Sequence, residues 1–234
     1  MPKRDAIPKN KPEKPVCFAL LLKQFNSELQ QQIEGTLCRR HIYKLGYPSE
    51  ALLAGGIANL PTELKARQLG NKASENYISK HPFDLSDIKD LPERVNNPIA
   101  IFNSTENDGT KIILTELKDK NGNNFVAVIK VTKDIHSQKN SLDVNSIRSV
   151  YPKNRAIELL NWLKSGDKLI AWVDGSKVRD FVSAQPIAQE RKKIIVDTIA
   201  DFIEKTGKGK KIEPLDNPNQ LEDVNNGSTY KYSK

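Results

Sequence analysis

The sequence predicts an α+β protein in which helices come first and a small sheet follows. Three observations support this fold class. Apolar residues recur at helical spacing from Ser27 to Leu45, runs rich in Ile, Val, Phe and Thr begin at Ile99, and residues 191–205 have an apolar stripe opposite charged residues. We therefore expect N-terminal helices packed on a mostly antiparallel sheet of four or five strands, with a C-terminal amphipathic helix.

Both ends of the chain are polar. Residues 1–15 mix Lys, Arg, Pro and Asn with almost nothing to bury, and residues 207–234 are similar in composition. Segments with so little apolar surface do not fold on their own. We therefore predict a disordered basic leader, a single domain over residues 16–206 and a disordered polar tail. Within the domain, we predict three parts in chain order: helical residues 16–90, sheet-rich residues 98–175 and a helix over 191–205.

The helical part begins with one long predicted helix. Ser27 and Gln30 form a capping-box pattern, and Gly46 is suited to end a helix in the left-handed conformation. We predict a helix from Ser27 to Leu45. Shorter helical pieces, broken by Pro and Gly, continue to Ser79 and are too short to be stable unless they pack on the sheet.

The sheet contains a predicted hairpin. Asn121-Gly122 lies in the join between Leu117 and Phe125, and this pair favours a tight turn. The two flanking strands are apolar at nearly every position, so we expect both faces of the sheet to be covered. A short helix over residues 154–165 and a strand in KLIAWVD should follow. Trp162 and Trp172 lie in these apolar segments, which predicts core packing for both.

Composition limits the function classes. The net charge of +8 favours a polyanionic partner such as RNA or DNA, because basic surfaces gain from counterion release. The two cysteines, Cys17 and Cys38, have no zinc-ligand spacing, and no apolar run approaches the roughly 20 residues that span a bilayer. No phosphate-binding Gly-rich loop, acidic metal cluster or Ser-His-Asp pattern stands out. We expect a cytoplasmic protein with no metal, no cofactor and no membrane contact.

Four segments in order resemble the phage MuF C-terminal domain family: LGYPSEALLAGGIANLPTEL, KHPFDLSDIKDLPERVNNPIAIFNS, ILTELKDKNGNNFVAVIKV and VNSIRSVYPKN. The resemblance covers residues 43–173. The family occurs at the end of phage head-morphogenesis proteins and in large polyvalent proteins of phages and conjugative elements. It implies a toxin-like effector of a phage or mobile element, delivered by phage into the host cytoplasm. An immunity protein or a phage head protein is then an expected partner.

The order of helices before a small antiparallel sheet is also similar to the fold shared by barnase, EndoU, colicin ribonucleases and RelE. This resemblance implies a metal-independent ribonuclease that cleaves RNA by attack of the 2′-OH. The alternative is a non-catalytic module that binds nucleic acid or protein. An enzyme of another class, such as a transferase with a small ligand, is a third reading.

Metal-independent RNA cleavage needs a general base, a general acid and cationic or hydroxyl donors for the phosphate. Histidine suits the first two roles because it gains and loses a proton near neutral pH. His81 is the best candidate, since it follows Lys80 in a polar corner just before the sheet. His41 falls in the predicted helix and His136 in a loop. A helix cap or a backbone hydrogen bond explains His81 without catalysis.

The segment NSIRSVYPKN supplies the predicted phosphate contacts. Strand alternation divides its side chains between two faces: Ile147, Ser149 and Tyr151 on one, and Ser146, Arg148 and Val150 on the other. Ser149 and Tyr151 can donate hydrogen bonds to a phosphate, and Arg148 or Lys153 can add positive charge. A packed edge aromatic and a turn-forming serine explain Tyr151 and Ser149 equally simply.

Four further residues are predicted to bind substrate: Lys80, Ser104, Thr105 and Asn145. An ST-turn within a hairpin explains the two hydroxyl residues equally well. Glu116 lies inside an otherwise apolar strand, so its carboxylate must be paired or must act as a general base. Lys130 on the partner strand is the predicted ion-pair partner.

Overall fold

The computed structural model describes residues 17–73, 83–130 and 144–213. Its α-helices are α1 (Phe18–Ile33), α2 (Glu50–Ala54), α3 (Ala66–Ala73), α4 (Leu91–Asn96), α5 (Ala156–Lys164), α6 (Gly175–Ser183) and α7 (Gln189–Thr206). Two 3-10 helices are η1 (Leu85–Ile88) and η2 (Gly166–Lys168). The strands are β1 (Ile42–Gly46), β2 (Thr62–Lys65), β3 (Ala100–Asn103), β4 (Thr110–Lys118), β5 (Asn124–Lys130), β6 (Asn145–Pro152), β7 (Ile170–Asp174) and β8 (Gly209–Lys210).

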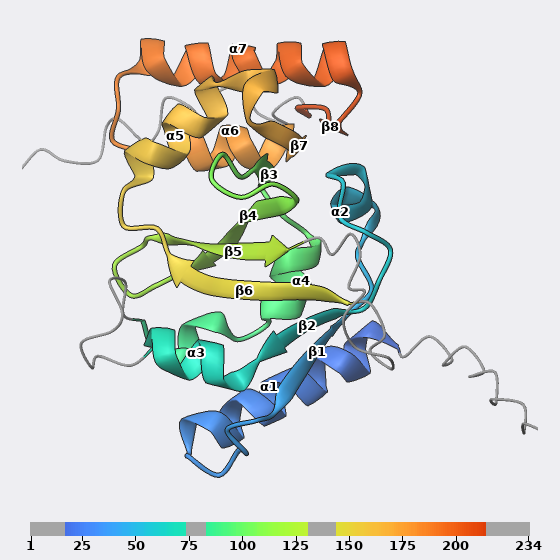
Figure 1. Cartoon of the computed structure of the whole chain (residues 1–234). Helices are drawn as coiled ribbons and strands as arrows, with labels where there is room; N and C mark the ends of the chain where they lie inside the picture. Colours follow the sequence, from blue (N-terminus) through green and yellow to red (C-terminus); the bar gives the residue numbers. More distant parts are fainter. Residues whose placement is uncertain (1–16, 74–82, 131–143, 214–234) are drawn as a thin grey trace, which may run out of the picture.

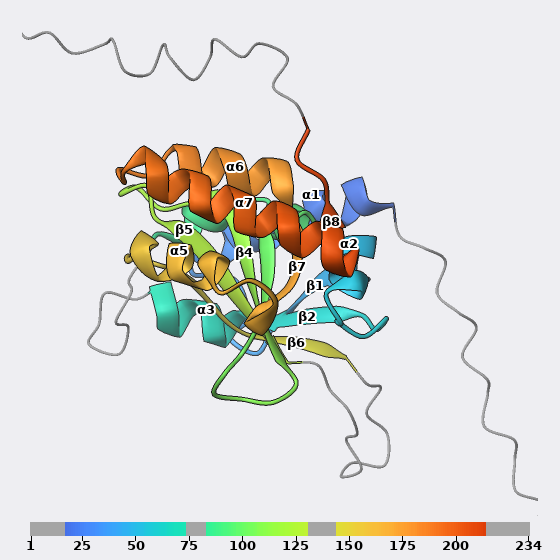
Figure 2. The same ribbon diagram turned by 90° about the horizontal axis from the view of Figure 1, so that it is seen from above.

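One sheet lies between two layers of helices (Figure 1). Helices α1, α3 and α4 cover one face, and α5, α6 and α7 cover the other. Seen from above, α6 and α7 run side by side over the sheet (Figure 2). The predicted α+β class is therefore confirmed, and so is the expectation that both faces of the sheet are covered.

The strand order is β1-β2-β6-β5-β4-β3-β7-β8. The pairings β2–β6 and β7–β8 are parallel, and the other pairings are antiparallel. The predicted strands appear as β3 to β7, but the predicted number of four or five is too low. The three additional strands are β1, β2 and β8, which have five, four and two residues.

The predicted helix from Ser27 to Leu45 is wrong in its bounds. α1 begins earlier and ends at Ile33, and β1 occupies Ile42–Gly46. Ser27 therefore lies inside α1 instead of capping it. Tyr43 and Leu45 are buried at the spacing of a strand. In the sequence, these apolar residues look like a continuation of the apolar stripe of the helix. The predicted helical part, residues 16–90, therefore also contains the strands β1 and β2.

The hairpin at Asn121-Gly122 is confirmed. Gly122 has a φ of +79°, and β4 and β5 pair antiparallel. The Asp119 Oδ1 atom accepts hydrogen bonds from the backbone N–H groups of Asn121 at 2.9 Å and Asn123 at 2.8 Å. Burial raises the pKa of Asp119, but the hydrogen bonds from Asn123 and Asn121 outweigh it and lower the pKa below its usual value. The charged carboxylate thus stabilises the turn.

Two hydrophobic cores form on the two faces of the sheet. Ile113 and Ala127 point into the core under α1 to α4, and their neighbours Leu114 and Val126 point into the core under α5 to α7. Trp172 is buried in the first core, and Trp162 packs against the second. The predicted packing role of both tryptophans is confirmed.

The C-terminal helix is confirmed, but the predicted start of the disordered tail at residue 207 is wrong. Residues 209–210 form β8, which pairs in parallel with β7. The Glu213 backbone N–H donates a hydrogen bond to the Ser176 Oγ atom at 2.9 Å. Backbone hydrogen bonds to β7 attach residues 209–210 to the sheet, and the composition of the segment does not predict such bonds. The predicted leader and the rest of the predicted tail fall on residues 1–16 and 214–234, which lie outside the described residues.

We expect Gly209→Ala to lower the free energy of unfolding by about 1–3 kcal/mol, because a Cβ atom there would overlap the Val173 carbonyl oxygen. Urea denaturation measures the change. Lys208→Ala is the matched control, since its side chain is exposed, and should change stability by less than about 0.5 kcal/mol. Equal stability of both variants would show that β8 does not dock on β7.

Candidate functional site

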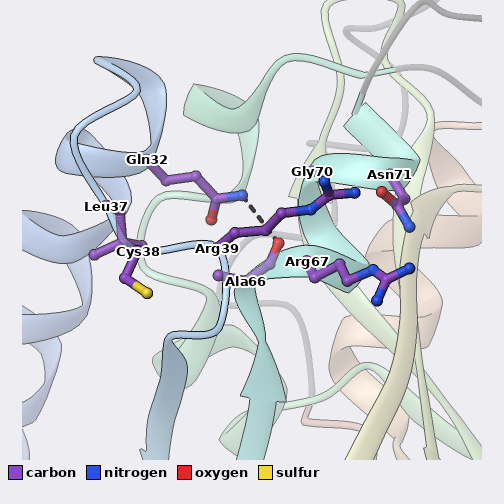
Figure 3. Close-up of a pocket in the computed structure, with 8 residues that line it drawn as sticks. All are labelled: Gln32, Leu37, Cys38, Arg39, Ala66, Arg67, Gly70 and Asn71. Carbon is purple, nitrogen blue, oxygen red and sulfur yellow. Dashed lines mark hydrogen bonds between the residues drawn. The ribbon is translucent and has the colours of Figure 1, made fainter.

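A cavity of about 260 Å³ opens between the connection from α1 to β1 and helix α3 (Figure 3). The described residues that line it are Gln32, Leu37, Cys38, Arg39, Ala66, Arg67, Gly70 and Asn71. The two sides of the cavity are far apart in the sequence. They meet because β1 and β2 pair antiparallel, which brings the end of α1 beside the start of α3.

A chain of hydrogen bonds fixes the inner wall of this cavity. The Tyr43 hydroxyl donates to Gln32 Oε1 at 2.5 Å, and Gln32 Nε2 donates to the Ala66 carbonyl at 3.0 Å. Burial, and then the negative charge of Glu28, raise the pKa of Tyr43 well above its ordinary value. The phenol therefore stays protonated and remains a donor. These bonds join α1, β1 and α3.

The cavity is positively charged. Arg39 and Arg67 are exposed, and neither makes a hydrogen bond or ion pair with another described residue. No carboxylate is present among the described lining residues. In Figure 3 the Arg39 side chain extends toward Gly70 of α3, and the Arg67 side chain extends outward below Asn71. A pair of guanidinium groups without an acidic neighbour favours a bound anion, and phosphate matches their planar fork.

A histidine–carboxylate pair lies close to the same corner of the fold. His41 Nε2 lies 3.0 Å from Glu28 Oε2, and the His41 ring meets the Tyr43 ring edge-on at 5.1 Å. His41 directly precedes β1, so its predicted place in a helix is wrong. The pair joins α1 to β1. It was not predicted, because the two residues meet only after the chain turns back beyond α1.

Of the predicted site residues, His81 and Lys80 lie outside the described residues. Lys153 is described, and its charge is already paired. Its Nζ atom lies 2.5 Å from Glu158 Oε2 and 5.1 Å from the centre of a Trp162 ring. The hydrogen bond from Lys153 lowers the pKa of Glu158 below its usual value. Lys153 therefore holds α5 against the end of β6.

A bulge in β6 changes the predicted arrangement of its side chains. Val128 pairs with Ser149 and Ile129 with Ile147, so Arg148 is the extra residue. Ile147 and Val150 consequently point into the same core, and the predicted grouping of Ile147 with Ser149 and Tyr151 is wrong. The alternation of side chains assumed for an ideal strand does not predict a bulge, so the two faces could not be assigned correctly from the sequence.

The other residues of this segment lie in different surroundings. Tyr151 is half-buried and packs against the second core, and the Ser149 Oγ atom is buried with no hydrogen-bond partner among the described residues. Arg148 is exposed and lines a second cavity with Lys130 and the loop after β3. That loop contributes Glu106 and Asp108, so the second cavity has mixed charge.

Glu116 forms ion pairs, as one of its two readings predicted, but not with the predicted partner. Its Oε2 atom lies 2.7 Å from Lys177 Nζ of α6 and 3.6 Å from Arg94 of α4. Lys130 instead lies opposite Thr110 in the β4–β5 register. The apolar surroundings of Glu116 in the sequence correctly predicted an ion pair, but the partners come from helices α4 and α6, which only the fold brings close.

Three of the predicted substrate-binding residues fall within the described residues. Ser104 Oγ accepts hydrogen bonds from the Glu106 and Asn107 backbone N–H groups, both at 3.3 Å, which is the ST-turn alternative. Thr105 is exposed in the same loop. Asn145 is buried, and its Nδ2 atom donates to the carbonyl groups of Ala58 and Leu60, both at 2.8 Å. It ties the loop before β2 to β6.

The described residues of the predicted site therefore lie on β4, on or just after β6 and in the loop after β3, and none of them lines the cationic cavity. Neither Arg39 nor Arg67 was among the predicted site residues. Their signal in the sequence is basic character alone, which many solvent-exposed arginines share. Within residues 17–73, 83–130 and 144–213, no group of three or more His, Cys, Asp or Glu side chains is arranged to hold a metal ion.

Comparison with known families gives one match. Residues 72–180 match the family model described as Phage MuF-C-terminal domain. This confirms the predicted resemblance over a little under half of the chain. Neither a curated protein nor a solved structure matches the chain. No helix in the described ranges is long and apolar enough to cross a membrane.

Asn145→Ala tests whether this residue supports the fold or a ligand. We expect the free energy of unfolding to fall by about 1–2 kcal/mol, because two buried hydrogen bonds are lost. Ser146→Ala, at the neighbouring half-buried position, is the control and should be nearly neutral. Unchanged urea denaturation of Asn145→Ala, combined with weaker binding of RNA, would instead assign Asn145 to a binding site.

Proposed function

We propose that this phage-related chain, whose residues 72–180 match the phage MuF C-terminal domain, binds RNA through the cationic cavity beside α3. The observation that supports this most directly is the pair Arg39 and Arg67, which share a cavity with no acidic lining residue among those described. The net charge of +8 adds a long-range attraction for polyanions. The proposal places this activity in the cytoplasm of a bacterial host.

The physical basis of binding is the release of counterions from the nucleic acid. Each phosphate of a single strand that a protein neutralises changes the slope of log affinity against log salt concentration by about 0.7. Two arginine–phosphate contacts therefore contribute about 1.4 to that slope. Arginine is also well suited to this role, because its planar group donates two parallel hydrogen bonds to phosphate.

We expect the double variant Arg39→Ala/Arg67→Ala to bind RNA about tenfold or more weakly, and its salt slope to fall by about 1.4. Fluorescence anisotropy at several salt concentrations measures both. The control is Arg155→Ala/Arg191→Ala, which removes the same charge from α7 and the residue before α5, on the other side of the sheet. The control should keep most of the affinity.

Equal losses in the two double variants would mean that charge is spread over the surface and that the cavity has no special role. An absence of RNA binding by the unchanged protein would overturn the proposal. The cationic cavity would then favour an acidic protein partner, such as a phage head protein or an immunity protein.

A metal-independent ribonuclease of a toxin-like effector is the second candidate. The antiparallel strands β3 to β6 follow helices α1 to α4, among which β1 and β2 also lie. This order supports the second candidate, because barnase-like ribonucleases also have helices before an antiparallel sheet. In this reaction the 2′-oxygen attacks the phosphorus and loses its proton to a base. The bond from phosphorus to the 5′-oxygen breaks, and an acid protonates that oxygen. Glu116 and Lys153 are engaged in ion pairs, so the proposal depends on His81.

His81→Ala should abolish cleavage of total bacterial RNA in EDTA, because the substitution removes the proposed proton carrier. Wild-type products should be discrete and end in a 2′,3′-cyclic phosphate. His136→Ala is the matched control and should cleave normally. Cleavage that survives in His81→Ala would eliminate this assignment, and intact RNA in all lanes would leave RNA binding without catalysis.

A further inference from the structure

We infer that the cationic cavity takes a single-stranded phosphodiester chain and holds one of its phosphates between the guanidinium groups of Arg39 and Arg67. This inference rests on the proposed RNA binding and narrows it to one conformation of the nucleic acid. Four properties of the cavity lead to it: its size, its donors, its lack of a stacking surface and its recessed position.

The size of the cavity suits a small part of a nucleic acid. Its volume of about 260 Å³ lies just below the roughly 300–1,000 Å³ that is usual for pockets of drug-sized ligands. A phosphate with part of its sugar is a smaller group than such a ligand. The rest of the chain must then continue outside the cavity, across the exposed surface of Arg39 and Arg67.

The hydrogen-bond donors of the cavity favour phosphate, which has several acceptor oxygens, over small anions with a single acceptor atom. Arg39 lines the cavity from the segment after α1 and Arg67 lines it from α3, so their planar donor groups can approach one anion from two sides (Figure 3). The Asn71 side chain lies at the same end and adds an amide donor. Gln32 is held by its bonds to Tyr43 and Ala66 and forms a fixed wall. Phosphate has enough acceptor oxygens to satisfy two guanidinium groups.

No aromatic side chain is found among the described residues that line the cavity, so base stacking is not its source of affinity. Contacts to phosphate carry no sequence information of their own. We therefore expect weak dependence of binding on base sequence.

The recessed position of the cavity distinguishes a single strand from a duplex. Its lining comes from the segment after α1 on one side and from α3 on the other, so a ligand must enter between two elements. A single strand bends locally and can push one phosphate inward. A-form duplex RNA is stiff and is bound through contacts across its wide minor groove, which needs an extended surface.

The exposed thiol of Cys38 provides a direct test, because Cys38 lines the cavity and Cys17 does not. The two cysteines flank α1, whose 16 residues are roughly 24 Å long. Alkylation by iodoacetamide, measured by mass spectrometry on the full chain, compares both thiols in one sample. Cys17 is therefore an internal control.

With single-stranded RNA at about ten times its Kd, alkylation of Cys38 should be about tenfold slower, while Cys17 reacts at its usual rate. The same RNA as a duplex, at the same concentration, should protect neither thiol. A DNA strand of the same sequence shows whether the 2′-OH contributes. Equal protection by duplex and single strand, or binding of RNA without protection of Cys38, would overturn the inference while RNA binding stands. Absence of all binding would overturn both.

The double variant Arg39→Lys/Arg67→Lys separates a built phosphate site from general attraction, because it keeps the net charge but removes the planar forks. We expect about tenfold weaker binding of single-stranded RNA than for the unchanged protein. Arg155→Lys/Arg191→Lys is the control and should bind normally. Full affinity in Arg39→Lys/Arg67→Lys would show that the guanidinium geometry is irrelevant and would overturn the inference.

Discussion

Strand β6 joins the N-terminal elements α1 to α3 to the rest of the sheet, because it pairs with another strand along each of its edges. On one edge β6 pairs antiparallel with β5, and on the other it pairs in parallel with β2. The elements α1, β1, β2 and α3 join the sheet through this parallel pairing. Asn145 reinforces it, since its side chain binds two carbonyl groups of the loop before β2. The bulge at Arg148 then returns Val150 to the same core as Ile147. The position of the cationic cavity depends on the β2–β6 pairing, because β2 leads directly into α3.

The excess positive charge is not equally available over the molecule. Lys153 is paired with Glu158, and Lys177 lies against Glu116, so these cations mainly hold helices to the sheet. A paired cation attracts a distant anion less, because the field of its partner cancels much of its own. Arg39 and Arg67 differ because the described lining of their cavity has no carboxylate. The charges of Arg39 and Arg67, unpaired among the described residues, therefore support a binding site in their cavity more strongly than the net charge of the whole chain does.

The family match and the cavity occupy successive parts of the chain. The match spans residues 72–180, which include β3 to β7, whereas the lining residues of the cavity precede it. His81 lies inside the match. The two proposed activities therefore rest on separate segments: binding depends on the N-terminal elements, and cleavage depends on the family domain. Because β2 pairs with β6, the two segments share one sheet, and a strand held at the cavity would remain attached to the family domain.

The sequence by itself determined the elements whose signal is local. The hairpin at Asn121-Gly122, strands β3 to β7 and helices α5 and α7 follow from turn chemistry and from the spacing of apolar residues within one segment. Tertiary structure alone decided the rest: the short strands β1, β2 and β8, the bulge in β6, the partners of Glu116 and the cavity that Arg39 and Arg67 both line. The physical reason is that each of these features forms between segments distant in the chain. Neither hydrogen bonding between remote strands nor the distance between two side chains is encoded in the periodicity of either segment.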